Sequence, residues 1–205
     1  MADVELIEPD WPAPAAVRAV ATTRSGGISR GPYASLNLGT HVGDNRGHVG
    51  ANRGRLTEAA GLPATPVWLN QVHGTRIADP AGADEGVTAD GATTVQPGVV
   101  CVVLTADCLP VLICDRAGQR VAAAHAGWRG LAGGVVEQAL SASAAATIAK
   151  PAERPVRRGS KSQKILIPGP LAHVLLVDAA NNIASAGIIA SAGKRKPAAA
   201  SAGMS

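Results

Sequence analysis

Aromatic residues are scarce in this sequence: phenylalanine is absent, and all aromatic residues together make up 2% of the 205 residues. The hydrophobic fraction is nevertheless 46%, so a core has to be built from aliphatic side chains and alanine. A chain of this length is long enough for one ordinary domain and short for two. We therefore expect a single domain with an aliphatic core.

Long apolar runs are also missing, since none approaches the roughly 18 residues that a membrane-spanning helix needs. The first five residues contain two acidic residues and no basic one, where a signal peptide would be basic. Cys101, Cys108 and Cys114 form an odd number without a CxxC pair, which argues against a disulfide scaffold. We therefore expect a soluble cytoplasmic protein without a membrane partner, whose cysteines are thiols or metal ligands.

Lysine is absent from the first 140 residues, which carry 10 arginines and 13 acidic residues and so a net charge of −3. Residues 141–205 carry 9 basic and 2 acidic residues, a net charge of +7. Nucleic-acid binding needs clustered basic residues on an ordered face, and the first 140 residues offer no such stripe. We therefore expect no nucleic-acid partner. In the alternative, the basic tail binds DNA in a salt-sensitive way, and deleting residues 141–205 abolishes this binding.

The composition changes near Ser141, where serine- and alanine-rich stretches, a proline- and arginine-rich segment and SAG repeats begin. Such a composition buries little apolar surface and favours disorder. We therefore divide the chain into a catalytic region, residues 1–140, and an atypical tail, residues 141–205.

Before that boundary the pattern predicts short elements separated by turns. Apolar runs predict three strands, residues 99–105, 110–114 and 120–125, and residues 67–73 are expected to form a strand that runs into a loop. Helical spacing predicts helices over residues 45–60 and 131–140. Together these elements indicate an α/β domain, a mixed β-sheet with flanking helices.

Two histidines and one cysteine are candidate ligands of one catalytic metal: His73, Cys108 and His125. Each stands at the end of a predicted strand or in a loop, so the three side chains can converge at one rim of a sheet. A catalytic zinc takes three protein ligands of nitrogen and sulfur type and keeps a fourth position open. Because their spacing matches no short metal motif, hydrogen-bonded histidines and a small buried cysteine remain the alternative.

Other polar residues are candidates for substrate or phosphate binding. Gly127 and Gly130 flank Arg129 where a strand opens into a helix, and a guanidinium there can bind phosphate with two hydrogen bonds. Asn37 lies among small residues in a loop-rich region, where a turn is the alternative role. Cys101 and Cys114 lie within apolar strand patterns and are predicted to be buried in the core.

Seven motifs, in order, resemble those of the laccase-domain family, which also goes by multicopper polyphenol oxidase and peptidoglycan editing factor. Members of that family are interpreted as purine nucleoside phosphorylases. The resemblance covers about residues 20–140. Its motifs are TTRSGGIS at 22–29, LNLG with HVGD at 36–44, NR at 52–53, NQVHG at 70–74, ADG at 89–91, TADCLP at 105–110 and HAGWRG at 125–130.

The resemblance implies that His73, Cys108 and His125 bind a catalytic zinc, with copper possible, and that Arg53 and Arg129 meet phosphate or substrate. It implies phosphorolysis of adenosine, inosine or methylthioadenosine, with adenosine deamination as a companion activity. The substrates are then a purine nucleoside and phosphate, and the protein is a monomer or homodimer. The implied fold is similar to that of a toxin deamidase.

Two other enzyme classes stay open. A blue multicopper oxidase needs many histidines, often as HxH pairs, whereas this chain has five histidines and no such pair. Its ligands suffice for one mononuclear site, although copper can occupy a zinc site. In the other class Cys108 is a thiolate nucleophile with His125 or His73 as its base, in a cysteine-type hydrolase acting on peptidoglycan precursors.

Residues 141–205 depart from the family, whose members continue with a Gly-Pro-Ala-Ile-Gly-like segment, a helix and further strands. The abrupt onset of lysine leads to the hypothesis of a frameshifted or truncated gene. An inactive truncated family member is therefore a further alternative.

Overall fold

The computed structural model describes residues 3–143, 146–148 and 172–178. A short 3-10 turn, Gly31–Tyr33, precedes the first helix. The other elements, in chain order, are β1 (Leu6–Ile7), β2 (Val17–Thr22), α1 (Arg46–Ala59), β3 (Ile77–Ala78), β4 (Gly91–Thr94), β5 (Val100–Thr105), β6 (Leu109–Asp115), β7 (Val121–Ala126), α2 (Trp128–Gly133), α3 (Val135–Ala142), β8 (Ala146–Ile148) and β9 (Ala172–Asp178).

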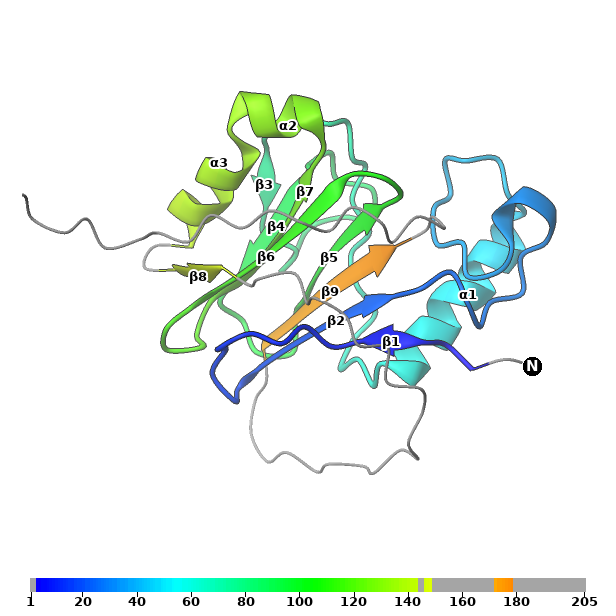
Figure 1. The fold of residues 1–205 in the computed structure, drawn as a ribbon, viewed down its shortest axis with the longest axis horizontal. Helices are drawn as coiled ribbons and strands as arrows, with labels where there is room; N and C mark the ends of the chain where they lie inside the picture. Colours follow the sequence, from blue (N-terminus) through cyan, green and yellow to red (C-terminus); the bar gives the residue numbers. More distant parts are fainter. Residues whose placement is uncertain (1–2, 144–145, 149–171, 179–205) are drawn as a thin grey trace, which may run out of the picture.

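The strands form two sheets, with the order β1-β2-β9-β5 in the first and β3-β4-β7-β6-β8 in the second. In the first sheet β9 runs parallel to both β2 and β5, and in the second sheet most pairs are antiparallel. Helix α1 and helices α2 and α3 lie at opposite sides of the molecule, with the sheets between them (Figure 1). The predicted α/β class with mixed strands is confirmed, but the strands are divided between two sheets.

Alternating side chains on β5 and β7 explain this layered arrangement. On β5, Val100 and Val102 pack in a cluster with Leu56 of α1, whereas Cys101 and Val103 join a cluster with residues of the second sheet. On β7, alternate alanines pack against α3 while the residues between them face the first sheet. Both faces of each strand are therefore buried, which is why their sequences are continuous apolar runs.

Three of the predicted strands are confirmed as β5, β6 and β7 within a residue or two at their ends. The predicted helix over residues 45–60 is confirmed as α1, whose first N–H groups are capped by the Asn45 side chain. The helix predicted over residues 131–140 is instead two helices, because Gly134 adopts the left-handed conformation (φ +90°) between α2 and α3.

The prediction of a strand over residues 67–73 was wrong, since this segment makes only an isolated β-bridge, between Asn70 and Thr88. Beyond Asn70, the backbone N–H groups of Val72, His73 and Gly74 are bonded to the side chain of Asp90 instead of to a neighbouring strand. A side-chain acceptor has here replaced the hydrogen bonds of a sheet ladder.

Strands β8 and β9 come from the region that the sequence assigned to an atypical tail. β9 lies inside the first sheet, and β8 extends the second sheet beside β6. Residues 141–205 therefore contribute two strands to the described fold, although their composition alone favoured disorder. The proline- and arginine-rich segment and the SAG repeats lie outside the described residues. Within the described ranges, no helix is long and apolar enough to cross a membrane.

A pair of glycine substitutions tests the packing around α1. A Cβ at Gly27 would overlap the backbone of Ser35 and Leu36, whereas a Cβ at Gly50, on the exposed side of α1, meets nothing within 4 Å. We expect Gly27→Ala to lower the free energy of unfolding by about 1–3 kcal/mol or more. Gly50→Ala should raise it by up to about 1 kcal/mol. Urea unfolding measures both, and equal effects would contradict the described packing.

Candidate metal centre

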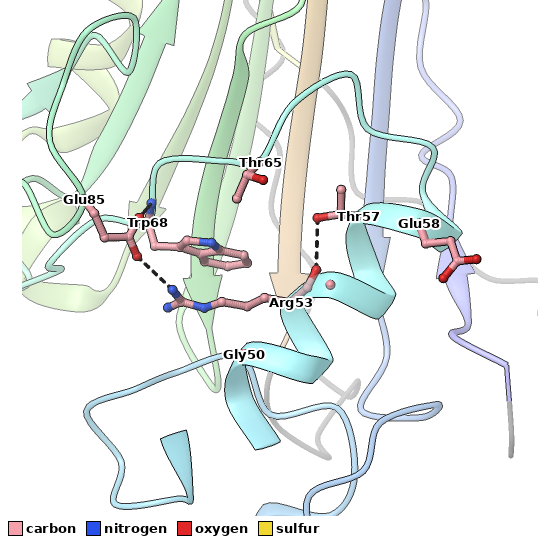
Figure 2. A pocket seen from close by; sticks show the side chains of 8 residues that line it. Gly50, Arg53, Thr57, Glu58, Thr65, Trp68 and Glu85 are labelled. Atoms are coloured by element: carbon pink, nitrogen blue, oxygen red, sulfur yellow. Dashed lines mark hydrogen bonds and ion pairs between the residues drawn. The ribbon is translucent and has the colours of Figure 1, made fainter. Parts of the chain in front are cut away.

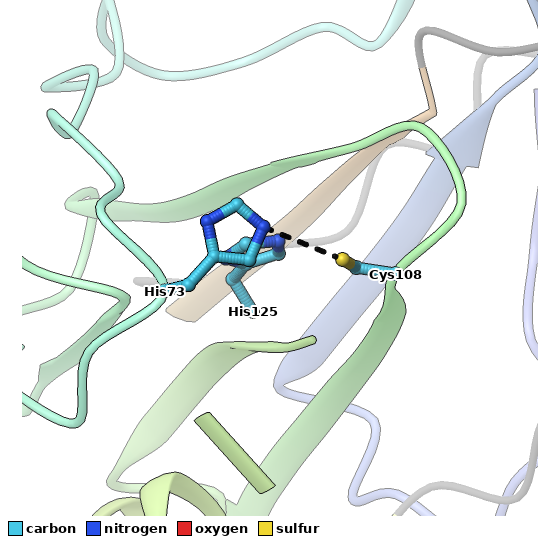
Figure 3. Close-up of side chains that lie close together, drawn as sticks. All are labelled: His73, Cys108 and His125. Atoms are coloured by element: carbon cyan, nitrogen blue, oxygen red, sulfur yellow. Dashed lines mark hydrogen bonds between the residues drawn. The ribbon is translucent and has the colours of Figure 1, made fainter. Parts of the chain in front are cut away.

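His73, Cys108 and His125 come together in the structure, with one potential ligand atom from each lying within 4.8 Å of the others (Figure 3). Cys108 Sγ is 3.7 Å from His73 Nε2, and the two imidazole rings meet edge to face with centroids 4.7 Å apart. His125 is buried, Cys108 is partly buried and His73 is exposed. The three side chains thus form a cluster that is open to solvent at one side.

Three different elements hold the cluster. His125 is on β7 and pairs with Pro110 of β6, so Cys108, just before β6, lies close to the end of β7. Gly127 follows β7 directly, and a Cβ there would stand 2.8 Å from Cys108 Sγ and 2.9 Å from His73 Cδ2. A glycine at this position therefore leaves the room that the cluster occupies.

His73 is the one residue other than glycine with a positive φ (+60°) in the described part of the chain. This conformation costs about 1–2 kcal/mol for a residue with a Cβ. Around it, the N–H groups of Val72, His73 and Gly74 all donate to the Asp90 carboxylate, at 3.2, 2.8 and 2.7 Å. Hydrogen bonds to a charged acceptor contribute about 1.5–3 kcal/mol each, enough to offset the strain.

Asp90 also accepts a hydrogen bond from the ring of His125, with 2.9 Å between Asp90 Oδ1 and His125 Nδ1. The Asp90 side chain is fully buried. Burial raises the pKa of this carboxyl, but the hydrogen bonds from His125 and from the loop lower it more, so the net pKa is below the ordinary 3.8. The sequence did not single out Asp90 as a site residue, although the ADG motif at 89–91 contained it.

The donor set fits a zinc ion. Around a tetrahedral zinc, nitrogen and sulfur ligands lie about 3.5 Å apart, given metal–ligand distances of about 2.0–2.3 Å. The Cys108–His73 distance of 3.7 Å is already close to this value, and the other pairs, at most 4.8 Å apart, need only a small side-chain movement. Because Asp90 binds Nδ1 of His125, Nε2 of that ring remains as the ligand atom.

The predicted substrate residue Asn37 lies outside the cluster, in a buried polar network. Its side chain bonds the backbone of Gly39 through both the amide nitrogen and the oxygen, and it also donates to Asp44. Asn52, which is fully buried, joins the same network through the carbonyl of Asn37. These contacts give Asn37 a structural role, and its contact with substrate stays a prediction.

Arg53 and Arg129 differ in how their guanidinium groups are engaged. The Cζ atom of Arg53 lies 4.1 Å from the centre of the Trp68 ring, and the guanidinium donates to the Leu38 carbonyl and to Glu85 Oε1, the latter at 2.9 Å. Arg53, Trp68 and Glu85 line a pocket beside α1 (Figure 2). Burial lowers the pKa of Arg53, and the hydrogen bond and charge of Glu85 oppose this effect. Arg129 is exposed and lies two residues after Gly127. Its Cζ atom is 4.3 Å from the centre of the Trp128 ring.

Over residues 18–161 the chain matches the family described as multi-copper polyphenol oxidoreductase laccase. The chain belongs to this family. Two relatives named purine nucleoside phosphorylase, from Pseudomonas aeruginosa and Escherichia coli, are 57% identical over 131 residues and 55% identical over 138 residues. These alignments cover 64% and 67% of this chain, but 53% and 57% of the relatives.

A solved structure of a Neisseria meningitidis protein is similar to this fold, with a TM-score of 0.64 and 48% sequence identity. The alignment covers 70% of this chain and 62% of that protein. The chain thus spans a little over half the length of the relatives that it matches. The motif-based prediction of the family is confirmed.

Thiol reactivity tests the arrangement of the three cysteines. Cys101 and Cys114 are fully buried, as predicted, whereas Cys108 is partly exposed. Burial and the nearby charges of Asp107 and Asp90 raise the pKa of the Cys108 thiol above its ordinary 9.0. After treatment with a chelator, we expect the native protein to react with one equivalent of maleimide, slowly at pH 7 and faster at higher pH, because the thiolate is the reactive form.

Mass spectrometry of the labelled protein identifies the modified residue, and Cys108→Ser is the control that removes the reaction. Labelling of Cys101 or Cys114 at a similar rate in the folded protein would contradict the burial described above.

Proposed function

We propose that this protein is a metal-dependent purine nucleoside phosphorylase with one metal ion, bound by His73, Cys108 and His125. The observation that carries the proposal is the convergence of these three donors in a chain whose relatives are named purine nucleoside phosphorylase. The proposed substrates are phosphate and adenosine, inosine or methylthioadenosine. The products are the free base and the sugar 1-phosphate, which is ribose 1-phosphate for adenosine and inosine and 5-methylthioribose 1-phosphate for methylthioadenosine.

Zinc is the proposed metal because two imidazoles and a thiolate suit it, and copper is the alternative because it binds such ligands more tightly. A divalent ion held by these three residues would supply Lewis acidity toward an oxygen atom of phosphate or substrate. Asp90 keeps the His125 ring oriented, and Gly127 keeps the space beside Cys108 and His73 free of a side chain. Deamination of adenosine, proposed as a companion activity, uses the same centre with water in place of phosphate.

Arg129 is the proposed phosphate partner. Its guanidinium is exposed, so it is available for two parallel hydrogen bonds to a phosphate, whereas that of Arg53 already has protein partners. Arg129 also lies two residues beyond Gly127, which borders Cys108 and His73. The phosphate can thus be bound next to the cluster.

The other enzyme classes have less support in the structure. Among the described residues, this cluster is the single group of three or more histidine, cysteine or acidic residues arranged to bind a metal, whereas electron relay in a multicopper oxidase needs several coppers. A cysteine hydrolase needs a thiolate at neutral pH, and the raised pKa of Cys108 opposes it in the metal-free protein. Metal content distinguishes the phosphorylase from the hydrolase.

Alanine at either histidine tests the metal centre. We expect His73→Ala and His125→Ala to lose most of the bound metal and to abolish the phosphate-dependent release of hypoxanthine from inosine, because each removes one of three ligands. Metal analysis by mass spectrometry and a coupled assay for hypoxanthine measure the two effects. His48→Ala, on α1, is the control and should keep both properties.

Wild-type protein that carries well below half an equivalent of metal after expression with added zinc would contradict the metal centre. Unchanged turnover in either histidine variant would contradict its catalytic role.

A matched pair of arginine variants separates phosphate binding from stability. We expect Arg129→Ala to raise the KM for phosphate by about tenfold or more, corresponding to a lost charge-assisted hydrogen bond, with little change in the free energy of unfolding. Arg53→Ala should instead lower the free energy of unfolding, because it removes contacts to Trp68, Leu38 and Glu85. Steady-state kinetics and urea unfolding measure both variants, and the opposite pattern would exchange the two roles.

A further inference from the structure

The buried carboxylate of Asp90 connects two parts of the candidate metal centre that come from distant segments. Its Oδ1 atom accepts from His125 Nδ1 on β7 and from the backbone N–H of His73 in the loop. Its Oδ2 atom accepts from the N–H groups of Gly74 and Val72. One side chain therefore contacts both histidines of the cluster, one through its ring and the other through its backbone.

The loop depends on a negative charge at this position. Three successive N–H groups, from Val72 to Gly74, point at the same carboxylate, which is the arrangement of a backbone anion nest. The left-handed conformation of His73 lies at its centre. Because the conformation of His73 sets the direction of its side chain, the carboxylate also decides whether the ring reaches Cys108.

The ring of His125 depends on the same carboxylate in another way. An acceptor at Nδ1 favours the tautomer that carries its proton on Nδ1, which leaves the lone pair of Nε2 for a metal. The Nδ1 atom of His125 lies 2.9 Å from Oδ1 of Asp90. A second hydrogen bond joins the same two residues, from the backbone N–H of His125 to the carbonyl of Asp90 at 2.7 Å.

We propose that Asp90 is a positioning residue that holds His73 and His125 in a single geometry for metal binding, an inference that rests on the proposed metal centre. Asparagine at this position has nearly the same shape but only one acceptor atom. Its oxygen can replace Oδ1, which accepts from His125 and His73, or Oδ2, which accepts from Val72 and Gly74, but its NH2 group then faces the donors of the other position. Asp90→Asn thus separates the charge and acceptor pattern from side-chain volume.

Zinc affinity of the purified, chelator-treated protein tests the proposal, measured by competition with a chromophoric chelator. We expect Asp90→Asn to bind zinc about 10–100-fold more weakly than wild type, the usual effect of losing an outer-shell partner. The matched control is Asp44→Asn. The Asp44 carboxylate accepts from Ser29, Asn37 and Asn45 but touches no member of the cluster, so its loss should reduce stability without changing zinc affinity.

Nitrogen-15 NMR of the His125 ring in metal-free wild type is a second measurement that needs no variant. We expect the neutral ring to carry its proton on Nδ1. A proton on Nε2 would overturn the proposal, as would wild-type zinc affinity in a folded Asp90→Asn variant. If the wild-type protein itself binds no zinc, the proposed function fails, and the tautomer alone then decides whether Asp90 positions His125.

Discussion

The apolar interface between the two sheets is the contact on which the rest of the structure depends. Residues of β2 and β5 in the first sheet pack against residues of β4, β6 and β7 in the second, and this interface contains most of the largest buried cluster. Neither sheet has enough large side chains to form a core alone, because phenylalanine is absent and alanine is frequent. The small residues on β7 allow close approach, and burial of both faces provides the apolar contact area that aromatic side chains would otherwise supply.

This interface also makes the candidate metal centre possible. β7 is a central strand of the second sheet, between β4 and β6, so His125 at its end is held rigidly and largely buried. Cys108 lies directly before the neighbouring strand β6, and Asp90 lies directly before β4 on the other side. Two metal ligands and a hydrogen-bond acceptor thus lie at the same end of three adjacent strands. His73 is the exception, since a loop carries it and the Asp90 carboxylate fixes that loop.

Local patterns predicted the elements of the second half of the fold well, because β5, β6 and β7 are apolar runs with turn residues at their ends. They could not predict the division into two sheets or the position of β9, because pairing between segments far apart leaves no local pattern. The 67–73 segment failed for a similar reason: its backbone partner is a side chain some 17 residues away, and nothing within the segment reveals it. For the site, donor chemistry selected His73, Cys108 and His125, but the engaged Arg53 and the exposed Arg129 differ only in their three-dimensional contacts, which the sequence does not show.

The position of β9 has a consequence for how the chain reaches its folded state. β2 and β5 both pair in parallel with β9. In the longer of the two pairings of β2, Val17 lies opposite Ala172, which is near the other end of the chain. Such long-range parallel pairing closes a large loop and forms slowly. During synthesis the five strands of the second sheet (β3, β4, β6, β7 and β8) are complete before β9 leaves the ribosome, whereas β2 waits for a strand that follows it by more than a hundred residues. Until then the edge of β5 and the apolar face of β2 are open to pairing with other chains, so aggregation competes with folding at this stage.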